Sequence, residues 1–156
     1  METNYCEILS NWEDEVGKVT VEIQLTSDRD IGKAADGALP ADKIRSTKVQ
    51  AIVDTGATIL VLPLSVIEQL GLPVIREARS RFADGRSMMR KIYGPIKLEV
   101  QRRVAIVEAL CAPEGVPALL GQVPLELLDL LVDSKNRRLI PNPESSDPDV
   151  ALVDVY

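Results

Sequence analysis

The part of the sequence most suited to chemistry is an acidic residue set between two apolar runs. Residues 51–60 read Ala-Ile-Val-Asp-Thr-Gly-Ala-Thr-Ile-Leu, with Asp54-Thr55-Gly56 at the centre. A carboxylate in apolar surroundings is unfavourable unless it is paired or hydrogen-bonded, and Gly56 indicates a tight turn. The pattern predicts a working carboxylate, which accepts a proton when ionised and donates one when protonated. The structural alternative is an ordinary strand-ending turn, in which Asp54 caps backbone amides.

The absence of histidine narrows the chemistry further. No histidine occurs in the chain, which excludes Ser-His-Asp and Cys-His nucleophilic sites and His-based zinc sites. Cys6 and Cys111 lie far apart in the sequence and match no metal-ligand spacing, so we expect free thiols and no metal. Chemistry therefore depends on carboxylates, hydroxyl groups, Lys, Tyr, the thiols or a bound cofactor.

Composition predicts one globular domain. The chain has 156 residues, of which 46% are hydrophobic but only 3% aromatic, so the core must consist of Val, Ile, Leu and Ala. A formal net charge of −6 argues against nucleic acid as the main ligand. We find no signal-peptide pattern and no apolar run long enough for a membrane. Together with the free thiols, this predicts a cytoplasmic location and no membrane partner.

Hydrophobic periodicity places the acidic motif between short strands. Residues 19–25 alternate apolar and polar side chains, which predicts a half-buried strand. A second strand, residues 48–53, leads directly into Asp54, and residues 58–62 form a third. Between the first two strands, residues 27–46 show no periodicity and read as a long exposed loop.

The rest of the chain predicts two short helices among further strands. Pro63 suits the first turn of a helix that Gly71 ends, and Pro124 opens a second helix over residues 125–131. Because no βαβ alternation appears, we expect a mainly antiparallel β barrel or sandwich. An Asp84-Gly85 pair predicts a hairpin turn. The remaining predicted strands are residues 74–82, 87–93, 96–100, 104–109, 118–121 and 138–140.

In this order along the chain, the features resemble retropepsin-like (clan AA) aspartic proteases. The resemblance rests on Ile-Val-Asp-Thr-Gly-Ala-Thr at residues 52–58, the Asp-Gly-tipped hairpin, and Leu119-Leu120-Gly121 followed by a helix. It covers about residues 17–143 and is closer to cellular and bacterial members than to viral ones. It implies a mainly β fold, the retropepsin-like acid-protease closed barrel with two short helices and one lobe per chain.

This resemblance also defines the expected domain limits. The protease domain is predicted at residues 17–143, with residues 27–46 as a long loop insertion. An N-terminal arm (1–16) precedes it and an acidic C-terminal tail (144–156) follows it. Residues 150–155 alternate like a strand, whereas the preceding Pro- and Ser-rich stretch is typical of disorder.

The resemblance assigns a role to each motif residue. Asp54 is the expected catalytic carboxylate, and Thr55 is expected to hydrogen-bond across a dimer. A flap would close over the substrate. Residues expected to support the active-site loop are Thr55, Gly56, Ala57, Leu119, Leu120 and Gly121. Residues expected in the flap are Ala83, Asp84, Gly85 and Arg86.

Peptide hydrolysis would require two such carboxylates. Two adjacent carboxylates cannot both ionise, so they hold one proton between them, and the charged one activates water while the other donates its proton. The chain contains Asp-Ser/Thr-Gly once, which predicts a symmetric homodimer acting as an aspartic endopeptidase on a peptide or protein substrate, without a cofactor.

Two alternatives to a protease remain open. A retropepsin-like dimer could bind peptides without cutting them, and a purely structural β domain is the other alternative.

One segment departs from the viral members of the family. Gln122-Val123-Pro124 stands where viral enzymes commonly place charged residues. The Arg102-Arg103 and Arg137-Arg138 pairs read as solvated turn charges, with binding of an acidic partner as the minor alternative.

Overall fold

A computed structural model describes residues 18–81, 84–113, 115–145, 147, 149, 151 and 152. Over these residues the chain forms nine strands, three α-helices and one 3-10 helix. The strands are β1 (Thr20–Ser27), β2 (Ser46–Val53), β3 (Leu60–Pro63), β4 (Val74–Arg81), β5 (Ser87–Val100), β6 (Arg103–Ala112), β7 (Ala118–Leu120), β8 (Leu130–Asp133) and β9 (Arg138–Pro141). The helices are α2 (Asp28–Ala35), η1 (Ala41–Lys43), α3 (Leu64–Leu70) and α4 (Gln122–Leu128).

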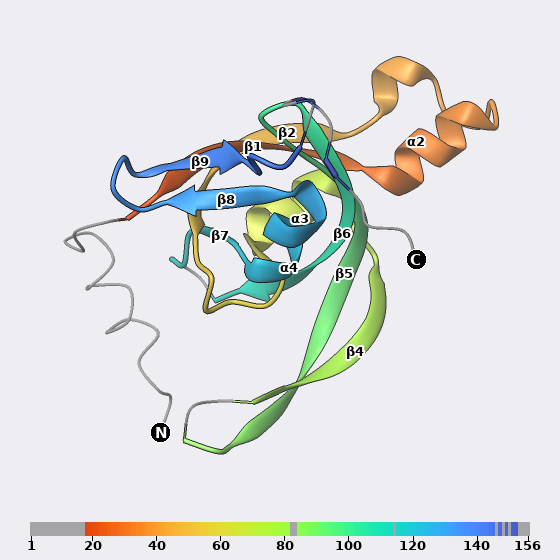
Figure 1. Cartoon of the computed structure of the whole chain (residues 1–156). Helices are drawn as coiled ribbons and strands as arrows, with labels where there is room; N and C mark the ends of the chain where they lie inside the picture. Colours follow the sequence, from red (N-terminus) through yellow and green to blue (C-terminus); the bar gives the residue numbers. More distant parts are fainter. Residues whose placement is uncertain are drawn as a thin grey trace, which may run out of the picture.

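One seven-stranded sheet closes on itself to form the barrel (Figure 1). Its strand order is β1-β2-β7-β3-β6-β5-β4, and β1 also pairs with β5, so six strands form a ring while β4 extends from it. Pairing is antiparallel except between β2 and β7 and between β3 and β6. Closure removes the exposed edges of the six ring strands, which a mainly β chain otherwise has to protect. The predicted retropepsin-like closed barrel is confirmed.

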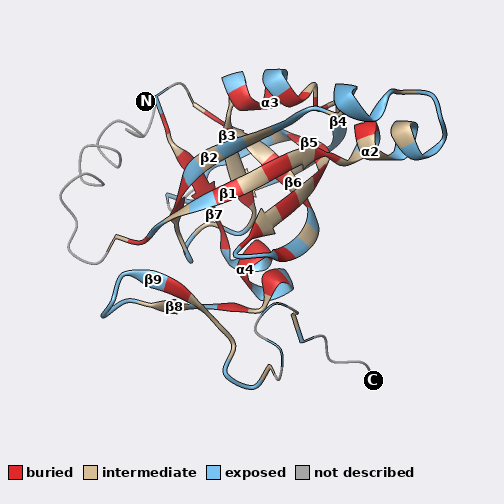
Figure 2. Cartoon of the chain, turned by 90° about the horizontal axis from the view of Figure 1, so that it is seen from above, coloured by how far each residue is buried: buried red, intermediate tan, exposed pale blue. Residues whose placement is uncertain are grey.

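Aliphatic side chains fill the inside of the barrel. Alternation in β1 directs Ile23 and Leu25 inward, and both side chains are fully buried. Leu60, Leu98 and other aliphatic residues of the neighbouring strands complete one core (Figure 2). Each fully buried side chain of this kind contributes about 1.5–3 kcal/mol, so the barrel does not need aromatic residues. No helix in the described part of the chain is long and apolar enough to cross a membrane.

The segment predicted as a long loop contains helical structure instead. Residues 27–46 include α2 and η1, so the described chain has one α-helix more than the two that were predicted. Ser27 caps α2 by accepting a hydrogen bond from the Asp30 N–H (3.2 Å). The Asp30 carboxylate, almost fully buried, accepts hydrogen bonds from the Arg45 backbone N–H (3.0 Å) and guanidinium Nε (2.8 Å). This contact lowers the pKa of Asp30 to about 2, mainly through the Arg45 side chain. Periodicity missed the helix because a polar ion pair, rather than an apolar stripe, holds it.

Helix ends and strand lengths largely follow the sequence signals. Gly71 ends α3 in the left-handed conformation, with φ of 59°, as predicted. Asp129 ends α4 in the same conformation, with φ of 55°. The helix predicted at residues 125–131 therefore begins and ends three residues earlier, and Leu130 and Leu131 belong to β8 instead. The strands predicted at residues 87–93 and 96–100 are one continuous strand, β5, with a change of register between Tyr93 and Ile96.

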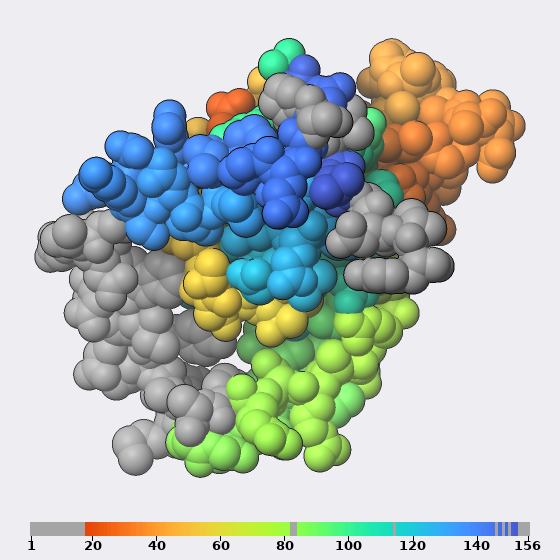
Figure 3. All heavy atoms as spheres, viewed as in Figure 1, coloured from red at the N-terminus to blue at the C-terminus, as the bar shows by residue number. Residues whose placement is uncertain are grey.

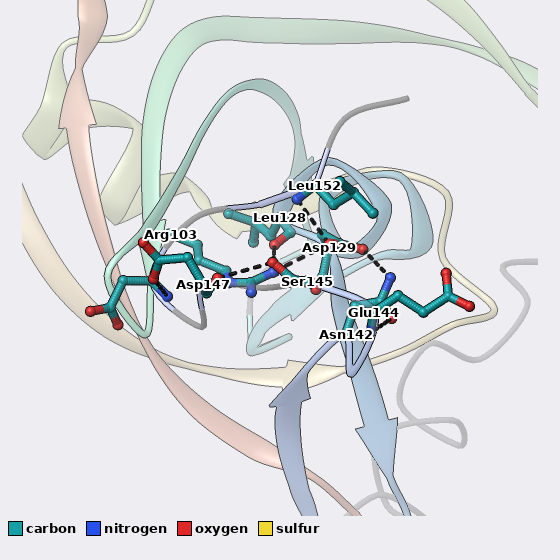
Figure 4. A network of polar contacts seen from close by, with 9 residues as sticks. Arg103, Leu128, Asp129, Asn142, Glu144, Ser145, Asp147 and Leu152 are labelled. Carbon is teal, nitrogen blue, oxygen red and sulfur yellow. Dashed lines mark hydrogen bonds and ion pairs between the residues drawn. The ribbon is translucent and has the colours of Figure 1, made fainter. Parts of the chain in front are cut away.

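Arg103 is the clearest departure from the sequence reading. Arg102 is exposed in the β5–β6 turn as predicted, but Arg103 is only 1% exposed. Its Nη1 donates hydrogen bonds to the backbone carbonyls of Leu128 (3.0 Å) and Asp129 (2.6 Å) at the end of α4 (Figure 4). A helix end leaves carbonyls without donors, and Arg103 supplies them from the facing strand.

Asp129 links the same cluster to the C-terminal part of the chain. Its carboxylate accepts hydrogen bonds from the Asn142 side chain (2.8 Å) and the Leu152 N–H (3.0 Å), as Figure 4 shows. These two contacts, led by Asn142, lower the pKa of Asp129. Of the alternating stretch 150–155, only residues 151 and 152 are described, and neither belongs to a strand. The predicted arm, residues 1–16, lies outside the described residues.

Candidate active site

Asp54 lies where the chain leaves β2 for the loop that leads to β3. Its backbone N–H donates to the Leu120 carbonyl on β7 (3.0 Å), which continues the parallel pairing of Val53 with Leu120. The strand then turns sharply, because the Ala57 N–H donates back to the Asp54 carbonyl (3.1 Å). Asp54 is therefore held at its backbone from two sides, while its side chain is only half-buried.

Gly56 brings the backbone up to the Asp54 carboxylate. The Gly56 N–H donates to Asp54 Oδ1 at 2.9 Å. A Cβ atom at Gly56 would lie 3.1 Å from the same oxygen, which is closer than an ordinary contact. Thr55, Gly56 and Thr58 are all exposed, so the tip of this loop is open to solvent in the single chain. The contact predicted for Thr55 across a dimer stays a prediction.

Gly121 passes directly under the active-site loop. A Cβ atom there would lie 2.4 Å from the Ile59 carbonyl oxygen and 2.7 Å from that of Ala57. The two following residues hydrogen-bond to the loop: the Gln122 N–H donates to the Ala57 carbonyl (2.8 Å) and the Val123 N–H to that of Thr58 (2.9 Å). The start of α4 thus supports the loop that carries Asp54, and only a residue without a side chain fits at position 121.

Leu119 and Leu120 place Gly121 in this position. Leu119 pairs with Ile52 on one side and with Val61 on the other, so β7 runs between the two strands that flank the loop. Leu120 is fully buried in the core. The structure therefore brings together the residues predicted to support the loop, from Thr55 to Ala57 and from Leu119 to Gly121.

The predicted flap is the hairpin of β4 and β5. It extends well beyond the barrel, at the end where the β2–β3 loop lies (Figure 1). In Figure 3 its green atoms lie below the yellow atoms of that loop and the cyan atoms of α4. Gly85 occupies the turn with φ of +87°. Ala83 lies outside the described residues.

The two charged residues at the flap turn pair with each other. The Asp84 carboxylate accepts hydrogen bonds from the Arg86 backbone N–H (3.0 Å) and side-chain Nε (2.6 Å). Both bonds lower the pKa of Asp84, the backbone bond most strongly. The opposite charges of Asp84 and Arg86 therefore offset each other at the turn.

The backbone donors of Gln122 and Val123 have no signal in the sequence. Gln122-Val123-Pro124 differs there from viral members of the family only in lacking charged side chains. In the structure, the backbone N–H groups at these two positions donate hydrogen bonds to the loop, and residue types do not reveal such bonds. Within the described ranges, no three Cys, Asp or Glu side chains are grouped as metal ligands.

Comparison with known proteins agrees with this arrangement. The family model described as "Aspartyl protease" matches residues 42–123, more than half of the chain and including both Asp54 and Gly121. No curated protein sequence matches the chain. Among solved structures, the chain is similar to the solution structure of the simian foamy virus (mac) protease, with 21% sequence identity and a TM-score of 0.45. The similarity covers 70% of this chain and 93% of that protease. From the family match, together with the closed barrel that carries Asp54 on the loop between β2 and β3, the chain belongs to the retropepsin-like aspartyl protease family.

Proposed function

We propose that the protein is an aspartic endopeptidase whose active site forms when two copies bring their Asp54 side chains together. The observation that carries the proposal is the supported Asp54-Thr55-Gly56 loop at the barrel surface of an aspartyl protease family member. One chain supplies one such carboxylate, whereas the reaction needs two.

The geometry of the loop suits a site shared by two chains. Its backbone is held firmly from beneath by Gly121 and the start of α4, while Thr55 and Gly56 are exposed. A two-fold axis next to the loop would place identical residues opposite each other, so each copy would complete the other's site. A rigid loop matters here, because small errors in position strongly reduce the rate.

The paired carboxylates would share one proton and divide the work between them. The ionised carboxylate takes a proton from water as the water oxygen adds to the peptide carbonyl carbon, and the protonated carboxyl donates its proton to the carbonyl oxygen. In the breakdown of the tetrahedral intermediate, the carboxyl that took the proton from water donates it to the amine as the C–N bond breaks. The other carboxylate takes a proton back from a hydroxyl group of the intermediate as the carboxyl product forms, which restores the shared proton. The Gly56 N–H, which donates to Asp54 Oδ1 at 2.9 Å, holds one carboxylate oxygen in place.

Replacing Asp54 with Asn tests the assignment. The change keeps the size of the side chain but removes its acid–base chemistry, so we expect peptide cleavage to fall by about 10³-fold or more. The free energy of unfolding in urea should stay within about 0.5 kcal/mol, because Asp54 is half-buried and makes no ion pair among the described residues. Undiminished cleavage by this variant would refute the role of Asp54. Peptide binding by the wild type without any product would indicate a non-cleaving dimer instead.

Mixing wild-type protein with the Asp54→Asn variant tests whether the site is shared. At constant total concentration and with subunit exchange, a two-chain site loses activity as the square of the wild-type fraction, so equal mixing leaves about one quarter. A site within one chain would leave about half. Gly32→Ala serves as the control variant, since its added Cβ meets nothing within 4 Å. Mixing wild-type protein with Gly32→Ala should cause no loss of cleavage activity.

A further inference from the structure

The β4–β5 hairpin carries a charge opposite to that of the rest of the chain. Residues 74–93 contain six basic and two acidic side chains, which gives +4, so the rest of the chain carries −10 of the total of −6. Like charges on neighbouring strands repel each other unless partners lie close by. The arrangement of these charges on the two faces of the hairpin indicates what they bind.

The basic residues on one face have partners within the chain. In an antiparallel hairpin, residues directly opposite each other share a face, and so do residues two positions apart on one strand. Arg76 pairs with Ile92, and Arg90 pairs with Ala78. Arg76 and Arg90 therefore lie on the same face of the hairpin. Arg76 forms an ion pair with Glu108 on β6, and the Arg90 guanidinium donates to the Cys111 carbonyl (2.8 Å). The Arg76 guanidinium also lowers the pKa of Glu108.

The other face exposes three basic residues for which no ion pair is found among the described residues. Arg79 lies opposite Met89, Arg81 opposite Ser87, and Lys91 opposite Glu77. All three basic side chains are exposed, and none of them takes part in a salt bridge within the described part of the chain. Glu77 is the single acidic residue on this face, so a positive excess remains there. We call Arg79, Arg81 and Lys91 the basic face of the hairpin.

The basic face continues the inner surface of the barrel. Tyr93 lies two residues after Lys91 on β5 and packs against the hydrophobic core, so alternation places Lys91 and Met89 on the same side of the strand. The opposite side carries Arg76, Arg90 and Ile92, which is buried but does not belong to that core cluster. The free positive charge is therefore on the side of the hairpin that continues the barrel interior, where a flap would contact a bound peptide.

We infer that the basic face selects substrates with two acidic residues separated by one residue, an inference that rests on the proposed function. Arg79 and Arg81 are two positions apart on β4, so their side chains leave the same face about 6.6 Å apart. An extended peptide repeats its side chains on one face at the same spacing, so an Asp/Glu-x-Asp/Glu segment matches both residues. The acidic remainder of the chain disfavours a nucleic acid here, because phosphates beyond the hairpin would meet negative charge.

Binding of fluorescent peptides to the Asp54→Asn variant tests the inference without any need for cleavage. Two peptides of the same length and otherwise identical sequence are compared, one with Glu-x-Glu and the other with Gln-x-Gln. The two partly exposed ion pairs of Arg79 and Arg81 with the glutamates should make the affinity for the acidic peptide about 10-fold higher at low salt. Adding Arg79→Gln and Arg81→Gln should reduce the ratio of the two affinities to about 2-fold or less.

The control uses a basic residue that is exposed elsewhere. Arg29 is exposed and belongs to α2, and Figure 1 shows α2 and the tip of the β4–β5 hairpin at opposite ends of the molecule. Arg29→Gln should therefore leave the affinity ratio unchanged. An equal loss with Arg29→Gln would show a general charge effect and overturn the inference, as would equal affinity of the starting protein for both peptides. Competition by single-stranded DNA as strong as that by the acidic peptide would also overturn it, because the basic face would then bind nucleic acid.

Cleavage measurements separate this inference from the proposed function. With wild-type protein, the kcat/KM ratio of the two peptides should show the same preference, and it should fall in the Arg79→Gln/Arg81→Gln variant. Cleavage of both peptides at equal rates would refute the acidic preference and leave the protease assignment intact. Selective binding of the acidic peptide without product would refute the protease assignment and leave the preference intact.

Discussion

Replacing Gly121 with alanine is expected to damage the active-site loop more than the fold. The added Cβ would lie 2.4 Å from the Ile59 carbonyl oxygen, 2.7 Å from that of Ala57 and 2.9 Å from the Thr58 carbonyl carbon. All three are backbone atoms, so no flexible side chain can move aside. Reaching an ordinary contact requires a shift of about 1 Å, which typically reduces an enzyme's rate about 10²-fold.

The expected effect on stability follows from the same contacts. Overpacking of this kind costs about 1–3 kcal/mol. Gly121 has φ of −85° and ψ of −179°, an extended conformation that alanine adopts freely, so the penalty is purely steric. The hydrogen bonds from the Gln122 and Val123 N–H groups to the loop should weaken as it moves away.

Three measurements test this expectation. Urea unfolding gives the loss of stability, peptide cleavage gives the loss of kcat/KM, and hydrogen exchange at the Gln122 and Val123 amides reports the loop contact independently of activity. Gly32→Ala is the matched control: its Cβ meets nothing within 4 Å, and in helix α2 it should add about 0.5–1 kcal/mol of stability. Wild-type activity and unchanged exchange at both amides in Gly121→Ala would refute the claim that position 121 supports the loop.

Two further substitutions test the ion pair of Asp30 and the hydrogen bonds of Arg103. The lowered pKa of Asp30 stabilises the folded state above its unfolded value of 3.8, and this contribution disappears as pH falls towards the folded value of about 2. Asp30→Asn should therefore lower the free energy of unfolding by about 1–2 kcal/mol at pH 7, after allowance for the partly exposed Arg45. The free energy of unfolding of this variant should also decrease less between pH 4 and pH 2 than that of the wild type. The same pH dependence in both proteins, measured by urea unfolding, would contradict this. Arg103→Met should destabilise the protein by about 3 kcal/mol, because it removes a buried cation and its hydrogen bonds to the Leu128 and Asp129 carbonyls at the end of α4. Arg103→Lys keeps the charge but not the shape of the guanidinium, so its effect should be intermediate. A thermal melt of Arg103→Met like that of the wild type would argue against this role.

Local signals in the sequence determined the type of fold and the candidate site. Alternation at residues 19–25 predicted β1, and Gly71 predicted the end of α3, because both depend on the backbone and its immediate neighbours. The Asp54 motif and Gly121, taken in order, indicated the family that the matching model shows. These features could be read from the sequence because they depend on residue type and spacing alone.

Other features depended on contacts between distant segments. Residues 28–35 form helix α2, which Asp30 holds through Arg45, and polar contacts of this kind leave no periodic pattern. Arg102 and Arg103 are neighbours of one residue type, yet one is exposed and the other buried. Arg102 lies in the β5–β6 turn, whereas Arg103 is the first residue of β6 and reaches the end of α4. Only the fold places that helix end there.

The site shows the same division between sequence and structure. The sequence by itself determined that a single Asp54-Thr55-Gly56 motif is present and that no histidine can replace its chemistry. The tertiary structure decided how the loop is held, through backbone donors of Gln122 and Val123 that residue types do not reveal. It also decided which arginines of the β4–β5 hairpin have partners and which remain exposed. The physical reason is that hydrogen bonds and ion pairs across the fold depend on which strands meet, and strand pairing is a property of the closed barrel rather than of any short segment.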